Sequence, residues 1–294
     1  MEKTKGKISS FQFFMMLFLS RTLTTVTYMS SYTENIRLSD MLIQPLFRIV
    51  IGTVIMLPVY FFYKKQGDKN IIEAVNEKSK TLGKVISVIF AVYFFYFTVV
   101  TVARLDLFAG TVVFPETDVE YMLVFAIILC CYGAYLGFEA LGRSSVLSAV
   151  FVIPALIFIM LTLREKTDLL NMTPVFYNGV SPVISVALDS VGQTVEYAVI
   201  ALCIPRVTGK IKKSFFIWLV SQTVLMAAMF FFAMTVMGNF ASTQLFPFHT
   251  MASIAEFAVF SRLDAIFTSV WIMCAFIKAG LLIYLQSDIL ATNF

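Results

Sequence analysis

Charged side chains, histidine and paired cysteines are scarce in this chain of 294 residues. Only 14% of its residues are charged, against about a quarter in an average soluble domain. The single histidine, His249, cannot build a histidine-based metal site on its own. The cysteines lie inside apolar runs without the Cys-x-x-Cys spacing of a metal or redox site, so we expect small buried hydrophobic residues. They are Cys130, Cys131, Cys203 and Cys274.

Recognisable catalytic signatures are also missing. The chain holds no GxSxG, HExxH, phosphate-binding loop or protein-kinase motif. Asp106 and Asp189 could be paired aspartates of an intramembrane protease, but neither lies in a supporting motif. A net charge of +4 gives no basic patch for nucleic acid. We therefore expect no enzyme, no cofactor or metal, and no nucleic-acid partner.

Apolar residues are abundant instead. They make up 59% of the chain, which includes 31 Phe, and the mean hydropathy is +0.86. The apolar runs are continuous and long, which indicates membrane-spanning helices. We predict an all-α, multi-pass integral membrane protein whose residues 1–294 form a single permease-like domain. Its eight expected spans are about 9–31, 41–63, 85–113, 121–140, 146–163, 182–204, 215–237 and 263–285.

Basic residues predict the orientation of these spans, because cytoplasmic loops are enriched in Lys and Arg. Alternate loops place most of them on one side: Lys3, Lys5, Lys7, Lys64, Lys65, Lys69, Lys78, Lys80, Lys84, Arg143, Arg206, Lys210, Lys212 and Lys213. The other side holds Arg37, Arg164 and Lys166, with Arg262 at a span edge. We therefore expect a cytoplasmic N-terminus and, after eight spans, a cytoplasmic end at residue 294.

The sixth span is interrupted by polar residues at its centre. Asp189, Gly192, Gln193 and Glu196 follow at i, i+3, i+4 and i+7, which places them on one face of a continuous helix. A carboxylate at mid-span costs on the order of 2.5 kcal/mol or more, so it is kept where protein or water surrounds it. These residues either line a ligand or ion cavity or form a structural ion pair with another span.

The first span has a similar polar half. Arg21, Thr24 and Thr25 share a face, together with Ser20, Tyr28 and Ser31. These side chains either line a site or join helices by hydrogen bonds. Spans one and six lie five spans apart, so the second is inverted relative to the first. Discontinuous helices at matching positions of inverted halves are typical of a transporter site at the membrane midplane. Helix ends there suit both groups of a zwitterion such as an amino acid.

The eighth span carries a lysine about 14 residues from its start. Lys278 shares a face with Thr268, Trp271 and Ala275, which favours an inward position, although a lysine can also extend to the membrane surface. Arg104 and Asp106 of span three are expected to pair near the outer interface. Arg262 and Asp264 are expected to form a charge cluster that opens span eight.

Four segments resemble the spore germination protein family of GerAB type, within the amino acid/polyamine/organocation permease superfamily. They read ISSFQFFMMLFLSR, VFPETDVEYMLV, ALCIPRV and SRLDAIFTSVWIMCAFIKAGLLIYL, and the last is the most specific. The resemblance covers nearly the whole chain. It implies a LeuT-like fold of two inverted five-helix repeats, with helices one and six discontinuous. That family has ten spans, so we expect this chain to lack the last two.

The resemblance also implies a function. Such a B subunit senses a nutrient germinant in the inner spore membrane, together with an A subunit and a lipoprotein C subunit. The ligand would lie between spans one and six beside span eight. In this sequence those positions are Arg21, Thr24, Thr25, Asp189, Gly192, Gln193, Glu196, Thr268 and Ser269, with Lys278 nearby.

Three functions remain open. The first is a germinant-receptor subunit that binds a small nutrient, with an amino acid preferred. The second is an amino-acid transporter coupled to H⁺ or Na⁺, in which Asp189, Glu196 or Lys278 would carry the coupling charge. The third is a scaffold that binds no ligand.

Overall fold

The computed structural model describes residues 6–27, 41–67, 69–116, 119–173, 179–257 and 262–293, which are largely helical. The first half contains β1 (Ile8–Ser9), α1 (Ser10–Val26), α2 (Gln44–Gln66), α3 (Ile71–Lys78), α4 (Lys80–Phe108), η3 (Ala109–Val113), α5 (Glu120–Leu136) and α6 (Phe138–Thr162). The second half contains η4 (Arg164–Lys166), η5 (Leu169–Met172), α7 (Ser181–Gly192), α8 (Glu196–Cys203), η6 (Ile204–Arg206), β2 (Val207–Thr208), α9 (Ile211–Met237), α10 (Phe240–Thr243), α11 (Pro247–Ile254) and α12 (Asp264–Asn293).

Five of the described helical segments are long and apolar enough to cross a membrane. These are α2, α4 with η3, α6 with η4, α9 and α12, and the bent pair α7–α8 would be a sixth. The chain is therefore an all-α membrane protein. Each of the eight predicted ranges holds a helix, but α1 and α5 have only 17 residues each. The count of eight spans and the LeuT-like repeat stay predictions.

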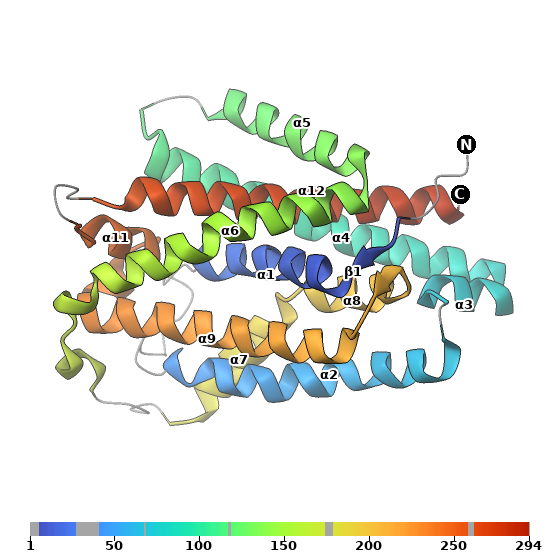
Figure 1. Cartoon of the computed structure of the whole chain (residues 1–294), viewed down its shortest axis with the longest axis horizontal. Coiled ribbons are helices and arrows are strands. Elements are labelled where there is room, and N and C mark those ends of the chain that lie inside the picture. The colour runs from blue at the N-terminus through green and yellow to red at the C-terminus, as the bar shows by residue number, and fades with distance from the viewer. Residues whose placement is uncertain are drawn as a thin grey trace.

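Helix α1 occupies the centre of the bundle. It packs against α6, α12, α9 and α8, and Figure 1 shows it between α6 and α9. Its mixed sequence of Phe, Leu, Met, Ser and Thr is buried on nearly all sides, and even Arg21 is only 2% exposed. A capping box starts it, in which the Ser9 hydroxyl accepts from the Gln12 amide. The same central burial applies to α8, where every residue except Ala198 is buried.

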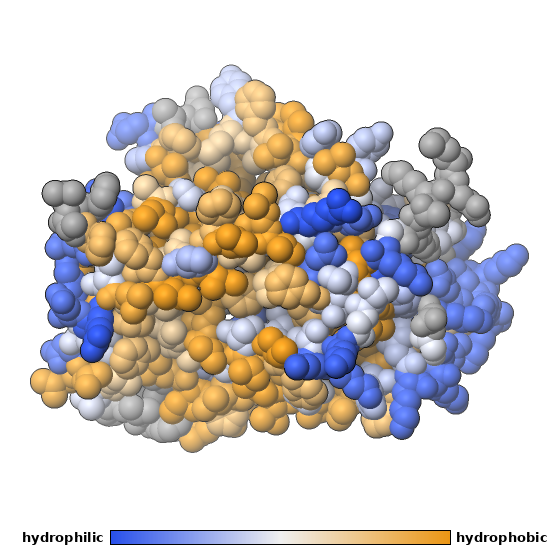
Figure 2. All heavy atoms as spheres, in the orientation of Figure 1, coloured by the Kyte–Doolittle hydropathy of each residue, from blue (hydrophilic) through white to orange (hydrophobic). Residues whose placement is uncertain are grey.

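The outer helices expose apolar surface instead. Val88, Val92 and Phe95 of α4 and Phe125 of α5 are among the exposed large hydrophobic residues. A soluble protein would bury such side chains, whereas a membrane protein turns them toward lipid. Figure 2 shows the apolar surface across the middle of the visible face and the hydrophilic surface gathered mainly toward the α3 end.

A short parallel pairing joins the start of α1 to the end of the broken helix. Ile8 pairs with Val207 and Ser9 with Thr208. Beside it, Arg206 forms an ion pair with Asp288 of α12 and donates to the Tyr284 hydroxyl at 2.9 Å. Because β1 precedes α1 while β2 follows α8, the first and sixth predicted spans run in opposite directions, as an inverted arrangement requires.

Several boundaries differ from the expectations. Helix α1 is unbroken through Arg21, Thr24 and Thr25, so the predicted interruption is absent from its described part, and residues 28–31 lie outside the described residues. The hydroxyls of Thr25 and Thr27 bond carbonyls four residues back, which satisfies these polar groups within a regular helix. Helix α6 begins well before 146, and α3 was not predicted. Two short helices, α10 and α11, lie between α9 and α12.

Candidate ligand-binding site

The sixth predicted span breaks where polar residues interrupt its apolar sequence. Helix α7 ends at Gly192, α8 begins at Glu196, and the two are bent by 44°. The predicted discontinuity of this span is confirmed. The prediction that its four polar residues share one helical face is wrong, because the bend separates them. Asp189, Gly192 and Gln193 are exposed, whereas Glu196 is 0% exposed.

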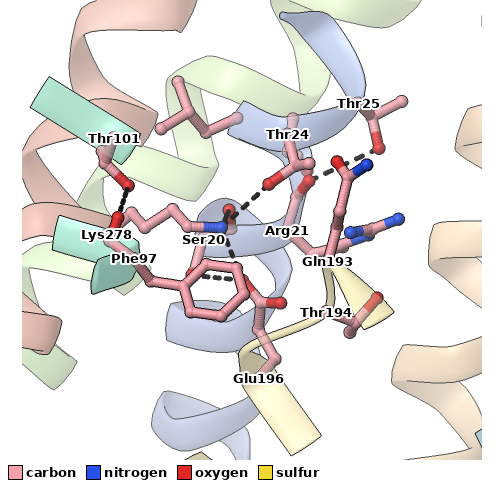
Figure 3. Close-up of polar contacts among 12 residues, drawn as sticks. Ser20, Arg21, Thr24, Thr25, Phe97, Thr101, Gln193, Thr194, Glu196 and Lys278 are labelled. Carbon is pink, nitrogen blue, oxygen red and sulfur yellow. Dashed lines mark hydrogen bonds and ion pairs between the residues drawn. The ribbon is translucent and has the colours of Figure 1, made fainter. Parts of the chain in front are cut away.

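Glu196 is the acceptor at the centre of a buried polar cluster (Figure 3). Its Oε1 accepts from the Ser20 hydroxyl at 2.5 Å and from the Lys278 ammonium at 3.2 Å. Lys278 is 3% exposed and also donates to the Thr24 hydroxyl at 2.8 Å and to the Ser20 carbonyl at 3.4 Å. The lysine of the eighth predicted span therefore points inward. Three helices, α1, α8 and α12, meet through this cluster.

Two neighbouring cavities lie beside this cluster. The first, of about 160 Å³, is lined by Arg21, Thr24, Thr25, Thr27, Met41, Gln44, Arg104, Val186, Asp189, Ser190, Gln193, Met226 and Phe230. The second, of about 260 Å³, is lined by Thr24, Tyr96, Phe97, Val100, Thr101, Arg104, Gly192, Gln193 and Lys278. Thr24, Arg104 and Gln193 border both, so the cavities meet at the helix break. Figure 3 shows Gln193 facing the polar half of α1.

Two arginines connect the broken helix to its neighbours. Arg21 of α1 donates through Nη2 to the Ser190 hydroxyl at 2.8 Å. Arg104 of α4 donates through Nη2 to the Gln193 side-chain oxygen at 3.2 Å. The end of α7 is thus held by guanidinium groups from two other helices, and both groups line the first cavity.

Most of the predicted site residues come together at these cavities. The lining includes Arg21, Thr24, Thr25, Asp189, Gly192, Gln193 and Lys278. Glu196 lies behind them as the partner of Lys278. Thr268 and Ser269 line neither cavity, and the Ser269 hydroxyl bonds the Ala265 carbonyl of its own helix. They start α12 about two to three turns before Lys278, which places them away from the break.

Several residues that line or adjoin the cavities were not predicted as site residues from the sequence. Arg104, expected near the outer interface, borders both cavities. Gln44 and Ser190 line the first cavity. Arg48 is 0% exposed and its Nη1 lies 3.6 Å from the sulfur of Met226, another lining residue. The available signal was a polar or charged residue inside an apolar span, which identifies Arg48 and Arg104 but not the face each would occupy.

No group of three or more His, Cys, Asp or Glu side chains that could hold a metal is found in the described ranges. His249 of α11 packs edge-on against the rings of Phe108 and Phe267, at centroid distances of 5.7 and 6.0 Å. Burial there holds the pKa of His249 below its ordinary value. The histidine therefore belongs to an aromatic cluster, which also includes Trp271 stacked on Phe108 at 4.3 Å.

The chain is similar in sequence to proteins of spore germination. YfkT of Bacillus subtilis (strain 168), whose name refers to spore germination, is 25% identical over 245 residues, which cover 80% of this chain and 67% of YfkT. No solved structure gives a significant match. The profile described as spore germination protein, a family of spore permeases, matches residues 7–294. This match spans nearly the whole sequence, and the chain therefore belongs to the spore germination protein family.

Proposed function

We propose that this chain is the membrane subunit of a germinant receptor, which binds a small nutrient, with an amino acid preferred, and triggers spore germination. The observation that carries the proposal is the pair of cavities at the α7–α8 break, walled by Arg21, Thr24, Asp189 and Gln193. A break in a membrane helix is tolerated where it lines a cavity, and such breaks bind zwitterionic solutes in permease folds.

The buried ion pair gives this site a conformational role. Lys278 joins α12 to α1 and α8. Residues of α1 and α12 also line the cavities, and α8 follows the break directly. A ligand that binds one arrangement of these helices better than another shifts their equilibrium, which is the signal a receptor must pass on. The receptor would pass it to an A subunit and a lipoprotein C subunit in the inner spore membrane. The N-terminus would be cytoplasmic.

An ion-coupled transporter is the competing function. A coupling cation in such a fold is coordinated by carbonyl, hydroxyl and carboxylate oxygens. Here the Ser20 carbonyl, the Thr24 hydroxyl and a Glu196 oxygen already surround the Lys278 ammonium. An internal cation in this position argues against a bound Na⁺, and the flux test below distinguishes a receptor from an H⁺-coupled transporter.

The test uses spores that carry Gln193→Ala in place of the normal chain. Gln193 is exposed at the break and borders both cavities, so its truncation alters the site without opening the core. We expect the amino-acid concentration for half-maximal germination to rise about tenfold. The reason is that the Gln193 side chain would lose a hydrogen bond to a charged group of the ligand, which is worth roughly 1.5 kcal/mol. The control is Arg143→Ala, at an exposed residue of α6.

An unchanged concentration dependence in Gln193→Ala, at normal protein levels, would overturn the site assignment. Proteoliposomes separate the two functions. A receptor binds the amino acid without net uptake, whereas uptake that follows an imposed H⁺ or Na⁺ gradient would establish the transporter.

A further inference from the structure

The buried centre of the molecule carries more positive than negative charge. Arg21, Arg48 and Lys278 are 2%, 0% and 3% exposed, and Glu196 is the carboxylate buried among them. Glu196 pairs with Lys278. Within the described residues neither arginine forms an ion pair. A buried charge without a counter-charge is costly, so this region is suited to a further anion.

Two residues that line the first cavity, Arg21 and Gln44, carry unused hydrogen-bond donors. Arg21 donates to Ser190 through Nη2, but its Nε and Nη1 have no hydrogen-bond partner among the described residues. Gln44 is 0% exposed and lines the same cavity, and neither its amide nitrogen nor its amide oxygen is hydrogen-bonded to a described residue. Arg48 does not line this cavity, and its guanidinium interacts with Tyr197, although Nε and Nη2 have no geometric hydrogen bond to a described residue. Buried polar groups are nearly always hydrogen-bonded, and each unpaired one costs about 1–3 kcal/mol. A hydrogen-bond acceptor is therefore expected between Arg21 and Gln44.

The opposite charge is present on another wall of this cavity. Asp189 of α7 lines it, and its carboxylate has no hydrogen bond to any described residue. The cavity therefore offers guanidinium and amide donors from α1 and α2 and a carboxylate from α7. Its volume of about 160 Å³ is below the roughly 300 Å³ at which pockets for drug-sized ligands begin, so it suits a small solute.

We infer that the first cavity binds the carboxylate of a small zwitterion through Arg21 and Gln44, and directs its ammonium group to Asp189. This assignment rests on the proposed function and adds to it the ligand's charge pattern and orientation. The recognition of the carboxylate comes from side chains of α1 and α2 rather than from backbone at a helix end. Arginine is well suited to it, because its planar donors match a carboxylate and its charge persists when buried.

The experiment compares acids with amides on the purified full chain in nanodiscs. The probes are the twenty amino acids and their carboxamides, which keep the ammonium and the side chain but lose the carboxylate charge. Binding is measured by calorimetry. We expect at least one free acid to bind, and its carboxamide to bind about 100-fold more weakly, because a charge-assisted contact is replaced by a neutral one.

Two variants test the assigned residues. Arg21→Gln removes the charge but keeps amide donors, and we expect it to bring the acid-to-amide ratio close to one. Gln44→Glu places a like charge beside the carboxylate of the ligand. We expect it to weaken binding of the amino acid about tenfold or more and to leave binding of the carboxamide unchanged. Arg143→Gln, on the exposed face of α6, is the control and keeps the ratio of the unmodified chain.

The outcomes separate this inference from the proposed function. Equal binding of acids and carboxamides by the unmodified chain would overturn the carboxylate site and leave an amino-acid receptor. Binding of propionate or acetate without any amino acid would support the carboxylate site and overturn the amino-acid function. If a folded Gln44→Glu protein keeps the acid-to-amide affinity ratio of the unmodified chain, the carboxylate site is overturned, even if Arg21→Gln does not fold.

Discussion

At the residue scale, the most consequential contact is the buried pair of Lys278 and Glu196. Their side chains are 4% and 0% exposed, and the Nζ to Oε1 distance is 3.2 Å. Ser20 donates to Glu196 Oε1 and Thr24 accepts from Lys278, while Glu196 Oε2 has no hydrogen-bond partner among the described residues. A buried pair adds little stability over an apolar pair of the same shape, but removal of one partner leaves the other charge uncompensated. The pair therefore makes each of its members hard to replace alone.

Lys278→Met should lower the free energy of unfolding by about 3–5 kcal/mol, because Glu196 is left buried without its cation. The double variant Lys278→Met/Glu196→Gln removes both charges and should recover much of this loss. Unfolding of the detergent-solubilised protein, followed by circular dichroism, measures both.

The matched control is the exposed pair of Arg143 and Glu139 on α6, whose side chains are 71% and 50% exposed. Arg143→Met should cost less than about 1 kcal/mol, since solvent screens such a pair. A Lys278→Met protein as stable as the unmodified chain would contradict the buried ion pair.

At the element scale, the close approach of α2 to α8 depends on one glycine. A Cβ atom at Gly52 would lie 2.0 Å from the Tyr197 hydroxyl oxygen and 2.9 Å from the ring carbon that bears it. Tyr197 is also packed edge-on against Trp218 of α9, at a centroid distance of 5.9 Å. The ring therefore has little freedom to move away, and α2 can pass α8 at this distance only with glycine.

Gly52→Ala should destabilise the protein by about 1–3 kcal/mol through overpacking against Tyr197. Tyr197→Phe in the same background should restore part of the loss, because the atom at 2.0 Å is removed. The readout is the thermal unfolding midpoint. Gly192→Ala is the control, since no atom lies within 4 Å of its added Cβ, and it should cause no loss. Equal midpoints for Gly52→Ala and Gly192→Ala would contradict the close packing.

The elements were predictable from the sequence to different degrees. Long apolar runs predicted a helix in every expected span. Asp189, Gln193 and Glu196 predicted the break in the sixth span, because polar groups inside a membrane helix are costly and are kept where the helix lines a cavity. The side to which Glu196 turns was not predictable, since it depends on a bend of 44°. The roles of Gln44, Arg48 and Arg104 were missed for a similar reason. Helical spacing shows which residues share a face of a helix, but tertiary packing determines which neighbouring helix or cavity that face contacts.

At the scale of the whole molecule, charge is distributed unequally between the two ends of the bundle. The end with α3 and the β1–β2 pairing carries most of the described basic residues, among them Lys64, Lys78 and Lys80. Figure 2 shows this hydrophilic end beside the apolar middle. The opposite end, with α10 and α11, holds Arg164, Lys166 and Arg262. Since basic loops stay in the cytoplasm, the α3 end should be the cytoplasmic one.

Single cysteines at the two ends test this orientation in intact cells. Lys78→Cys places a thiol on exposed α3, and Thr243→Cys places one on exposed α10. A membrane-impermeant maleimide should label Thr243→Cys in intact cells and Lys78→Cys only after the membrane is opened, because only the α10 end would face outward. The unmodified chain, whose exposed cysteine is Cys131, supplies the background. If intact cells label Lys78→Cys and not Thr243→Cys, the orientation is the reverse of the predicted one. The polar half of α1 would then face the cytoplasm.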